Sequence, residues 1–145
     1  MNDGGLTWLT LPAELASVEP FTEFVRAGAR LAAIAESDAA KLDLIIEELV
    51  VNVARYAYPN GRGMTRVGYA IAGPGSIFVQ VCDEGPDYNP LDREPPDFTL
   101  GLADRPIGGL GIYLIKGLVG SLKYARDGDR NVLSFLFPLT EGAPG

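Results

Sequence analysis

The sequence predicts an α+β domain in which helices pack on one face of a mixed, mainly antiparallel sheet. Three observations support this fold class. Short runs with strand composition occur as sequential pairs joined by turn residues, two long segments repeat apolar residues at helical spacing, and the helices are segregated from the strands along the chain. The chain has 145 residues, which is the size of one domain, so we expect residues 1–145 to form a single unit.

One strand and two helices are expected in the first part of the chain. Residues 6–11 alternate weakly and predict a short strand. Apolar residues then recur at helical spacing over residues 17–35. A second helix begins at a cap formed by Ser37 or Asp38 and runs to about Tyr58. Its expected buried stripe consists of Leu42, Ile45, Ile46, Leu49, Val53 and Tyr56.

The remaining expected elements alternate between hairpins and one helix. In order they are strands at about 65–71 and 76–83, a helix at 110–119, and strands at about 121–126 and 132–137. Turn residues at 72–75 and 127–129 join the strands of each pair into hairpins.

Residues 84–111 differ in character from the rest, because they hold 10 of the 29 Gly and Pro residues of the chain. A compact domain seldom carries so long a segment without regular structure unless the segment is a functional loop. The sequence therefore predicts a lid at about residues 86–108.

Composition excludes several classes of site. The chain has no histidine and a single cysteine, which removes His-dependent triads and dyads, His-ligated zinc, a phosphoaccepting histidine and thiolate metal cages. Cys82 follows an apolar run, so we expect it to be a buried strand residue.

Charge and terminal composition predict where the protein works. The formal net charge is −7, which argues against a broad surface for nucleic acid or anionic membrane. The N-terminus lacks the regions of a signal peptide, and no uncharged apolar run approaches the ~18 residues of a membrane span. We expect a soluble cytoplasmic protein that contacts neither nucleic acid nor membrane directly.

Glu48 and Asn52 form the first feature that could carry chemistry. Their spacing of four places them on one face of the second helix, whereas Glu47 lies about 100° away and is expected to be solvated. The functional interpretation is a carboxylate base beside an amide oxygen that binds a hard cation such as Mg²⁺. The alternative is the polar shoulder of an amphipathic helix.

Two further features follow along the chain. Asp83-Glu84-Gly85 ends a predicted strand, where a carboxylate can accept a hydrogen bond from an amine and a glycine allows close approach of a ligand; an ordinary acidic turn is the alternative. Gly108-Gly109-Leu110-Gly111 opens an apolar helix, where exposed N–H groups can bind phosphate; glycines that make a loop flexible are the alternative.

In this order the three features resemble the N, G1 and G2 boxes of the GHKL ATPase superfamily, whose ATP-binding Bergerat fold would cover nearly the whole chain. Within it, the sequence looks most like the bacterial anti-sigma factor serine/threonine kinases. The details that match this branch are Ala57-Tyr58-Pro59, Asn89-Pro90, and Gly-Gly-Leu-Gly-Ile-Tyr-Leu-Ile at 108–115.

The resemblance implies a role for each matching residue. Glu48 would be the general base for a serine or threonine hydroxyl, and Asn52 would hold Mg²⁺ against the ATP phosphates. Asp83 would accept the adenine amino group, with Gly85 lining the base. The residues implied at the phosphates are Arg105 and Gly108 on the lid, and Gly109 and Gly111 through their N–H groups.

The resemblance also implies partners. The substrate would be a STAS-domain anti-sigma factor antagonist, and the kinase would sequester a sigma factor and form a homodimer. The alternative that the chain is a nucleotide-binding anti-sigma module without kinase activity stays open. Tyr56 stands where many relatives carry a histidine, and Asn131 stands where some relatives carry a threonine. A detached histidine kinase domain would have to act in trans, since the chain has no histidine.

Three basic residues have both a functional and an ordinary interpretation. Lys116 follows the glycine cluster and could contact phosphate or a partner. Arg26 and Arg30 are four apart on the first helix and could form a partner surface. Solvated helix charges are the alternative for all three.

Overall fold

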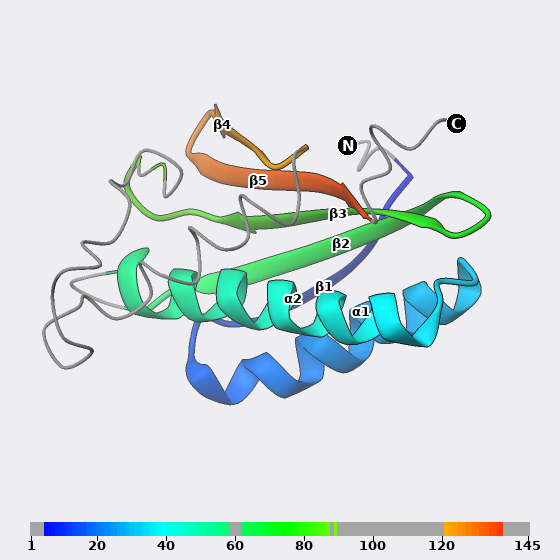
Figure 1. Ribbon diagram of the computed structural model, residues 1–145. Helices are drawn as coiled ribbons and strands as arrows, with labels where there is room; N and C mark the ends of the chain where they lie inside the picture. The colour runs from blue at the N-terminus through cyan, green and yellow to red at the C-terminus, as the bar shows by residue number, and fades with distance from the viewer. Residues whose placement is uncertain (1–4, 59–61, 88, 90–120, 138–145) are drawn as a thin grey trace, which may run out of the picture.

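A computed structural model gives the fold and describes residues 5–58, 62–87, 89 and 121–137. The elements are β1 (Thr7–Pro12), a short 3₁₀ helix η1 (Leu15–Ser17), α1 (Val18–Leu31), α2 (Glu36–Tyr56), β2 (Met64–Gly73), β3 (Ser76–Asp83), β4 (Lys123–Asp127) and β5 (Arg130–Phe137). The strands form one five-stranded sheet in the order β1-β2-β3-β5-β4, and every described pairing is antiparallel. Both α-helices lie on one face of this sheet (Figure 1), so the predicted α+β architecture is confirmed.

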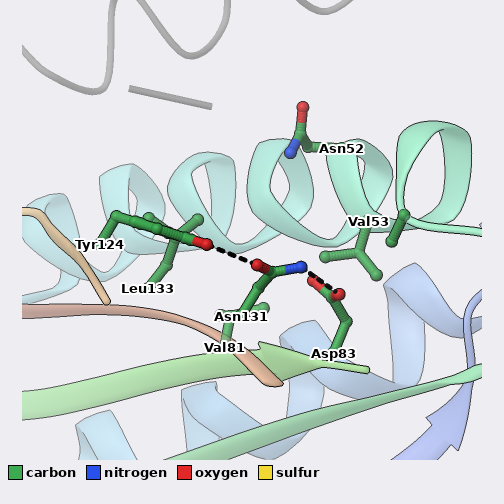
Figure 2. A pocket seen from close by; sticks show the side chains of 8 residues that line it. Asn52, Val53, Val81, Asp83, Tyr124, Asn131 and Leu133 are labelled. Carbon is green, nitrogen blue, oxygen red and sulfur yellow. Dashed lines mark hydrogen bonds between the residues drawn. The ribbon is translucent and has the colours of Figure 1, made fainter. Parts of the chain in front are cut away.

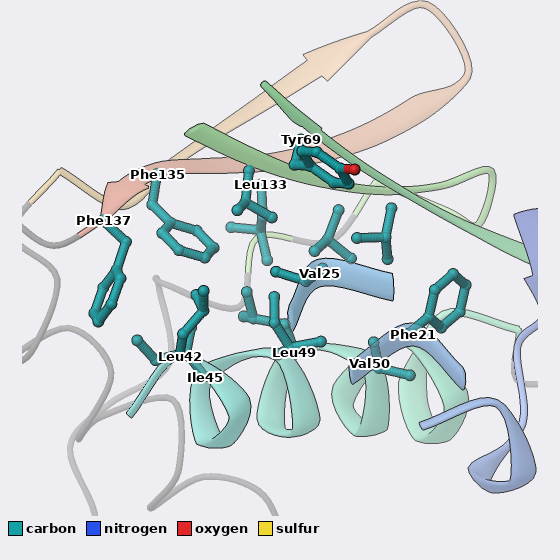
Figure 3. Close-up of a cluster of buried hydrophobic side chains, with 14 of the residues drawn as sticks. Phe21, Val25, Leu42, Ile45, Leu49, Val50, Tyr69, Leu133, Phe135 and Phe137 are labelled. Atoms are coloured by element: carbon teal, nitrogen blue, oxygen red, sulfur yellow. The ribbon is translucent and has the colours of Figure 1, made fainter. Parts of the chain in front are cut away.

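The core lies between the two α-helices and the inner face of the sheet (Figure 3). Its large buried side chains are Phe21 and Val25 from α1, Leu42, Ile45, Leu49 and Val50 from α2, and Val67, Val79, Phe135 and Phe137 from the sheet. Burial of these apolar surfaces is the main stabilising contribution to the fold. It also fixes α2 across the strands, so that the polar residues of α2 have a defined position over the sheet.

The ends of the helices correct two expectations. α1 ends at Leu31 rather than near residue 35, because the chain turns at Ala33, whose φ is 60°. The N-cap of α2 is Ala35, and no side chain caps the helix, so the predicted cap at Ser37 or Asp38 is wrong. Asp38 instead lies in the first turn, where a negative charge is favourable to the helix dipole.

Two side chains also differ from the expected pattern. Tyr56 is only partly buried, so it is not a full member of the core stripe of α2. Arg26 is not simply solvated, because its Nη2 donates to Asp43 Oδ2 at 2.8 Å and ties α1 to α2. Arg30 is exposed, as an ordinary helix charge would be.

The inner face of the sheet changes from apolar to polar at one end. Thr65, Asp83 and Asn131 occupy successive cross-strand positions on β2, β3 and β5, and Arg126 of β4 is paired with Asn131. Thr65, Asp83 and Asn131 are buried, with 0%, 9% and 5% of their surface exposed. We call these four residues the polar row, and two of them, Asp83 and Asn131, line the candidate site.

Several expectations lie outside the described residues. They are the helix at 110–119, the lid beyond Asn89, and the residues Arg105, Gly108, Gly109, Gly111 and Lys116. Within the described ranges, neither α-helix is long and apolar enough to cross a membrane.

Candidate functional site

A pocket lies between the C-terminal part of α2 and the polar row (Figure 2). Its walls are mostly apolar, and its polar groups gather at the ends of the strands. The lining residues are Asn52, Val53, Ala57, Val81, Asp83, Tyr124, Asn131 and Leu133. Apolar walls with a few convergent polar groups are typical of a small-molecule site.

Asp83 is the anionic group of this pocket. Its Oδ1 accepts a hydrogen bond from the backbone N–H of Gly85 at 2.8 Å and another from Nδ2 of Asn131 at 2.9 Å. Among the described residues, no hydrogen bond engages Oδ2. A buried carboxylate held in this way can accept one further hydrogen bond, from a ligand N–H group.

Asn131 connects Asp83 to the edge of the sheet. Its Nδ2 also donates to the carbonyl oxygen of Pro86 at 2.9 Å, while its Oδ1 accepts from Nη1 of Arg126 at 3.1 Å. The hydroxyl of Tyr124 lies 2.6 Å from Asn131 Oδ1 and 2.7 Å from Asp87 Oδ1. Arg126 Nη1 donates to the carbonyl oxygen of Gly85 at 2.8 Å. The β4–β5 hairpin therefore holds the segment 85–87 at the end of β3.

Gly85 is required by the close approach of α2 to this segment. A Cβ at Gly85 would overlap the carbonyl oxygen of Ala57, at the C-cap of α2. The neighbouring Tyr58 hydroxyl donates to the carbonyl oxygen of Met64 at 2.7 Å and accepts from the N–H of Glu84 at 2.8 Å. Burial raises the pKa of Tyr58, so it remains a neutral donor and acceptor.

Asn52 marks the other end of the site. Its side chain projects from α2 away from the Asp83–Asn131 pair (Figure 2). The residue is 4% exposed, and Oδ1 has no hydrogen-bond partner among the described residues. A buried amide oxygen without a partner is destabilising, by about 1–3 kcal/mol, unless a ligand or cation engages it.

Glu48 lies one helical turn before Asn52 and is partly buried, whereas Glu47 is exposed, as the register predicted. Burial raises the pKa of the Glu48 carboxyl, the charge of Glu47 adds to this effect, and Arg55 opposes it. A carboxylate with a raised pKa is a better proton acceptor near neutral pH.

The donor set fits a magnesium ion that arrives with a nucleotide rather than a resident metal. No cluster of three or more Cys, Asp or Glu side chains that could hold a metal is present in the part of the chain that the structure describes. Mg²⁺ is commonly held by only one or two protein oxygens together with substrate phosphates and water. The unpartnered Oδ1 of Asn52 is suited to be such a ligand.

The structure places Glu48 and Asn52 one turn apart on the second half of α2, and Asp83 and Gly85 at the end of β3. Of these four residues, Asn52 and Asp83 line the pocket. Sequence reasoning did not find Tyr124 and Arg126, which belong to the hydrogen-bond network of Asn131. It also did not find Thr65, which is paired with Asp83 but whose Oγ1 has no hydrogen-bond partner among the described residues. Strand periodicity carries a signal for Thr65 and Asn131, because each is a polar residue in phase with the buried apolar residues of its strand.

Comparison with known proteins gives one family and one similar structure. Residues 11–137 match the family described as the histidine kinase-like ATPase domain. No curated protein matches the chain. The crystal structure of the RsbU and RsbW domains of Rv1364c from Mycobacterium tuberculosis is similar, with a TM-score of 0.60 and 20% sequence identity over 90% of this chain. The match spans 31% of that longer chain, and at this identity the likeness bears on the fold.

Proposed function

Because the chain belongs to the histidine kinase-like ATPase domain family, we propose that it is a cytoplasmic, ATP-dependent protein serine/threonine kinase. Its substrate would be a STAS-domain anti-sigma factor antagonist, and the protein, as a homodimer, would sequester a sigma factor until unphosphorylated antagonist binds instead. The observation that carries the proposal is the position of Glu48 and Asn52 on the helix that borders the Asp83 pocket, with Asn52 Oδ1 having no hydrogen-bond partner among the described residues.

The pocket suits the adenine end of ATP. The side chains of Val53, Ala57, Val81 and Leu133 line the pocket with apolar groups, of the kind that a flat base contacts, and all four are nearly buried in the nucleotide-free chain. Oδ2 of Asp83 accepts a hydrogen bond from the exocyclic amino group of the base. The apolar walls supply non-directional affinity, and the carboxylate supplies the orientation of the base.

The phosphate end extends toward Asn52. This residue would hold Mg²⁺ through Oδ1, and the bound ion would neutralise charge on the phosphates. Asn52 fits this role because the amide carbonyl is buried yet has no competing partner in the described part of the chain.

Glu48 acts on the hydroxyl of the substrate protein. The hydroxyl oxygen forms a bond to the γ-phosphorus while the bond from that phosphorus to the β–γ bridging oxygen breaks, and ADP leaves with the electron pair. The hydroxyl proton passes to the Glu48 carboxylate. The raised pKa of this carboxyl supports its role as the acceptor.

The assignment to an anti-sigma system rests on the sequence resemblance given above, and the similar fold of a structure that contains an RsbW domain is consistent with it. The description of the matched family names no substrate, so the substrate must be tested directly. Sequestration of a sigma factor and phosphorylation of an antagonist are separable activities, and one experiment can address both.

The test combines the purified chain with γ-labelled Mg-ATP and STAS-domain proteins of the source organism. We expect phosphoserine or phosphothreonine on one of them. Glu48→Gln should abolish transfer and retain nucleotide binding, and Glu47→Gln is the matched control because Glu47 is exposed on the same helix.

Other outcomes would change the conclusion. Transfer by Glu48→Gln at the wild-type rate would remove Glu48 as the base. Binding of ATP and of a sigma factor without transfer to any antagonist would support the interaction module without kinase activity. Absence of Mg-ATP binding would overturn the proposed function itself.

A further inference from the structure

We propose that Asn131 is a positioning residue that sets the base specificity of the pocket. It fixes Asp83 as a stationary hydrogen-bond acceptor, so that the site takes a purine with an amino group at C6 and rejects a purine with a carbonyl group there. This inference rests on the proposed function, in which Asp83 receives the base of a nucleoside triphosphate. It adds to that function a residue on β5, the strand next to that of Asp83, that determines which base is accepted.

The orientation of the Asn131 amide follows from the chemistry of its neighbours. Nδ2 faces acceptors only, which are Asp83 Oδ1 at 2.9 Å, the Pro86 carbonyl oxygen at 2.9 Å and, more distantly, the Gly85 carbonyl oxygen at 3.5 Å. Oδ1 faces Arg126 Nη1 at 3.1 Å, and a guanidinium group can only donate. A flipped amide would place oxygen against these acceptors and nitrogen against a donor. The arrangement therefore has one acceptable orientation.

The fixed amide immobilises the Asp83 carboxylate. Oδ1 accepts hydrogen bonds from both Asn131 and the Gly85 backbone, at 2.9 and 2.8 Å. Both donors reach the same oxygen atom, so the carboxylate is held from one side. They also prevent rotation of the carboxylate, and this leaves Oδ2 at one position relative to the pocket.

The register of the sheet makes this arrangement rigid. Asp83 and Asn131 are directly paired on β3 and β5, and Asn131 is paired in turn with Arg126 on β4. Arg126 also holds the Gly85 carbonyl at 2.8 Å, so the amide and the loop share one anchor. Positions fixed by paired strands are more precise than positions fixed by a loop alone.

The rigidity of the Asp83 carboxylate matters because a 6-aminopurine and a 6-oxopurine each carry a hydrogen-bond donor on the edge that contains C6 and N1. A 6-aminopurine offers its amino group, whereas a 6-oxopurine offers an N–H at N1 beside a carbonyl oxygen. A mobile carboxylate could shift toward N1 and accept either base. A carboxylate held opposite C6 meets the carbonyl oxygen instead, and two buried acceptors then face each other without a proton.

The test measures calorimetric affinities for Mg-ATP and Mg-ITP, whose bases differ in the C6 substituent and the N1 proton. We expect the wild-type chain to bind ATP at least about 100-fold more tightly than ITP. Asn131→Leu, which removes the donor but keeps a similar volume, should lower this ratio about tenfold, the equivalent of one charge-assisted hydrogen bond.

A second variant tests the same inference through an exposed residue. Arg126→Met removes one of the two donors at Asn131 Oδ1, the other being the Tyr124 hydroxyl, and it also releases the Gly85 carbonyl oxygen. The amide and the segment 85–87 are then held less firmly, so the ATP/ITP ratio should fall about two- to fivefold. Lys123→Met is the matched control, because Lys123 is an exposed cation three residues earlier on the same strand and therefore on its other face. Its ratio should equal that of the wild type.

The outcomes separate this inference from the proposed function. A wild-type chain that binds ATP and ITP equally would overturn the inference and leave the kinase proposal intact. An unchanged ratio in folded Asn131→Leu would also overturn it, and if that variant does not fold, an unchanged ratio in Arg126→Met does so. A wild-type chain that binds neither nucleotide would overturn both proposals.

Discussion

Gly28 of α1 packs directly against the ring of Tyr69 on β2, where a Cβ added to Gly28 would lie 2.6 Å from Cε1 of the ring. Both residues are buried, and the Tyr69 ring also contacts Phe24 at a centroid distance of 5.0 Å. The glycine inside the helix is therefore a packing requirement of the helix–sheet interface. Two opposing effects decide what a larger residue would do there.

Gly28→Ala should destabilise the protein. Alanine favours the helix by about 1 kcal/mol, but overpacking a buried contact costs about 1–3 kcal/mol, and Tyr69 is confined by Phe24. We expect a net loss of about 1 kcal/mol in the free energy of unfolding, measured by urea denaturation. Ser37→Ala, at an exposed position of α2, is the control and should change stability by less than about 0.5 kcal/mol. Equal effects of the two substitutions would contradict the packing argument.

Asn52→Leu should have opposite effects on stability and on binding. It removes a buried oxygen that has no partner in the described structure, so the nucleotide-free protein should be as stable as the wild type or more stable by up to about 1 kcal/mol. The shift in melting temperature that Mg-ATP produces in the wild type should disappear. Asn52→Ala should also lose this shift, but with lower stability because it leaves a cavity. Undiminished Mg-ATP binding by both variants would exclude Asn52 from the phosphate site.

The raised pKa of Glu48 predicts a pH-dependent gain in stability for Glu48→Gln. Because the folded-state pKa lies above the ordinary value of 4.5, the ionised carboxylate is disfavoured in the folded protein. The loss of folding stability caused by the ionised Glu48 is fully present at pH values above the folded-state pKa. It vanishes at pH values below the pKa of the unfolded chain. We expect Glu48→Gln to stabilise the protein by less than about 1 kcal/mol at pH 7, since solvent screens this partly exposed group.

Urea denaturation at pH 7 and pH 4 measures this difference. The gain should be present at pH 7 and absent at pH 4, and Glu47→Gln serves as the exposed control. The phosphoryl-transfer rate should fall as the pH is lowered through the raised pKa of Glu48, because the proton acceptor is then occupied. A stability gain of the same size at both pH values would assign it to packing instead.

Cys82 should resist thiol reagents in the folded protein. It is 3% exposed, and burial raises its pKa to about 11 although Arg66 and Arg130 act in the opposite direction. The reactive thiolate is therefore scarce at pH 8. Iodoacetamide should label the native chain far more slowly than the chain in urea, and the measurement is simple because the chain has one cysteine. Native labelling at the rate of a free thiol would show that β3 opens readily.

Hydrophobic periodicity was sufficient to predict most of the fold. The strand at 76–83 was predicted with its observed bounds, because buried and less buried residues alternate along most of it and turn residues come directly before its start. The end of α1 was not predictable in this way, since Ala33 adopts a left-handed conformation that alanine does not favour. That conformation depends on the connection between two packed helices rather than on the local sequence.

The candidate site was predictable only in part. Glu48 and Asn52 follow from helical spacing, and Asp83 from its place at the end of a strand. Tyr124 and Arg126 could not be assigned, because they act on Asp83 through Asn131 and their role depends on the pairing of β4 with β5. Local sequence does not specify which polar side chain of a neighbouring strand will be opposite a given carboxylate.

The pairing of β3 with β5 has a consequence for the synthesis of the protein. Asn131 follows Asp83 by 48 residues, which a ribosome adds in roughly 2–10 s at ordinary elongation rates. Throughout that interval β3 lacks its neighbour on one side, and the emerging chain presents an open strand edge next to a carboxylate without its amide partner. A nascent chain therefore cannot form the complete pocket, and nucleotide cannot assist the folding of the chain before its last described strand has emerged.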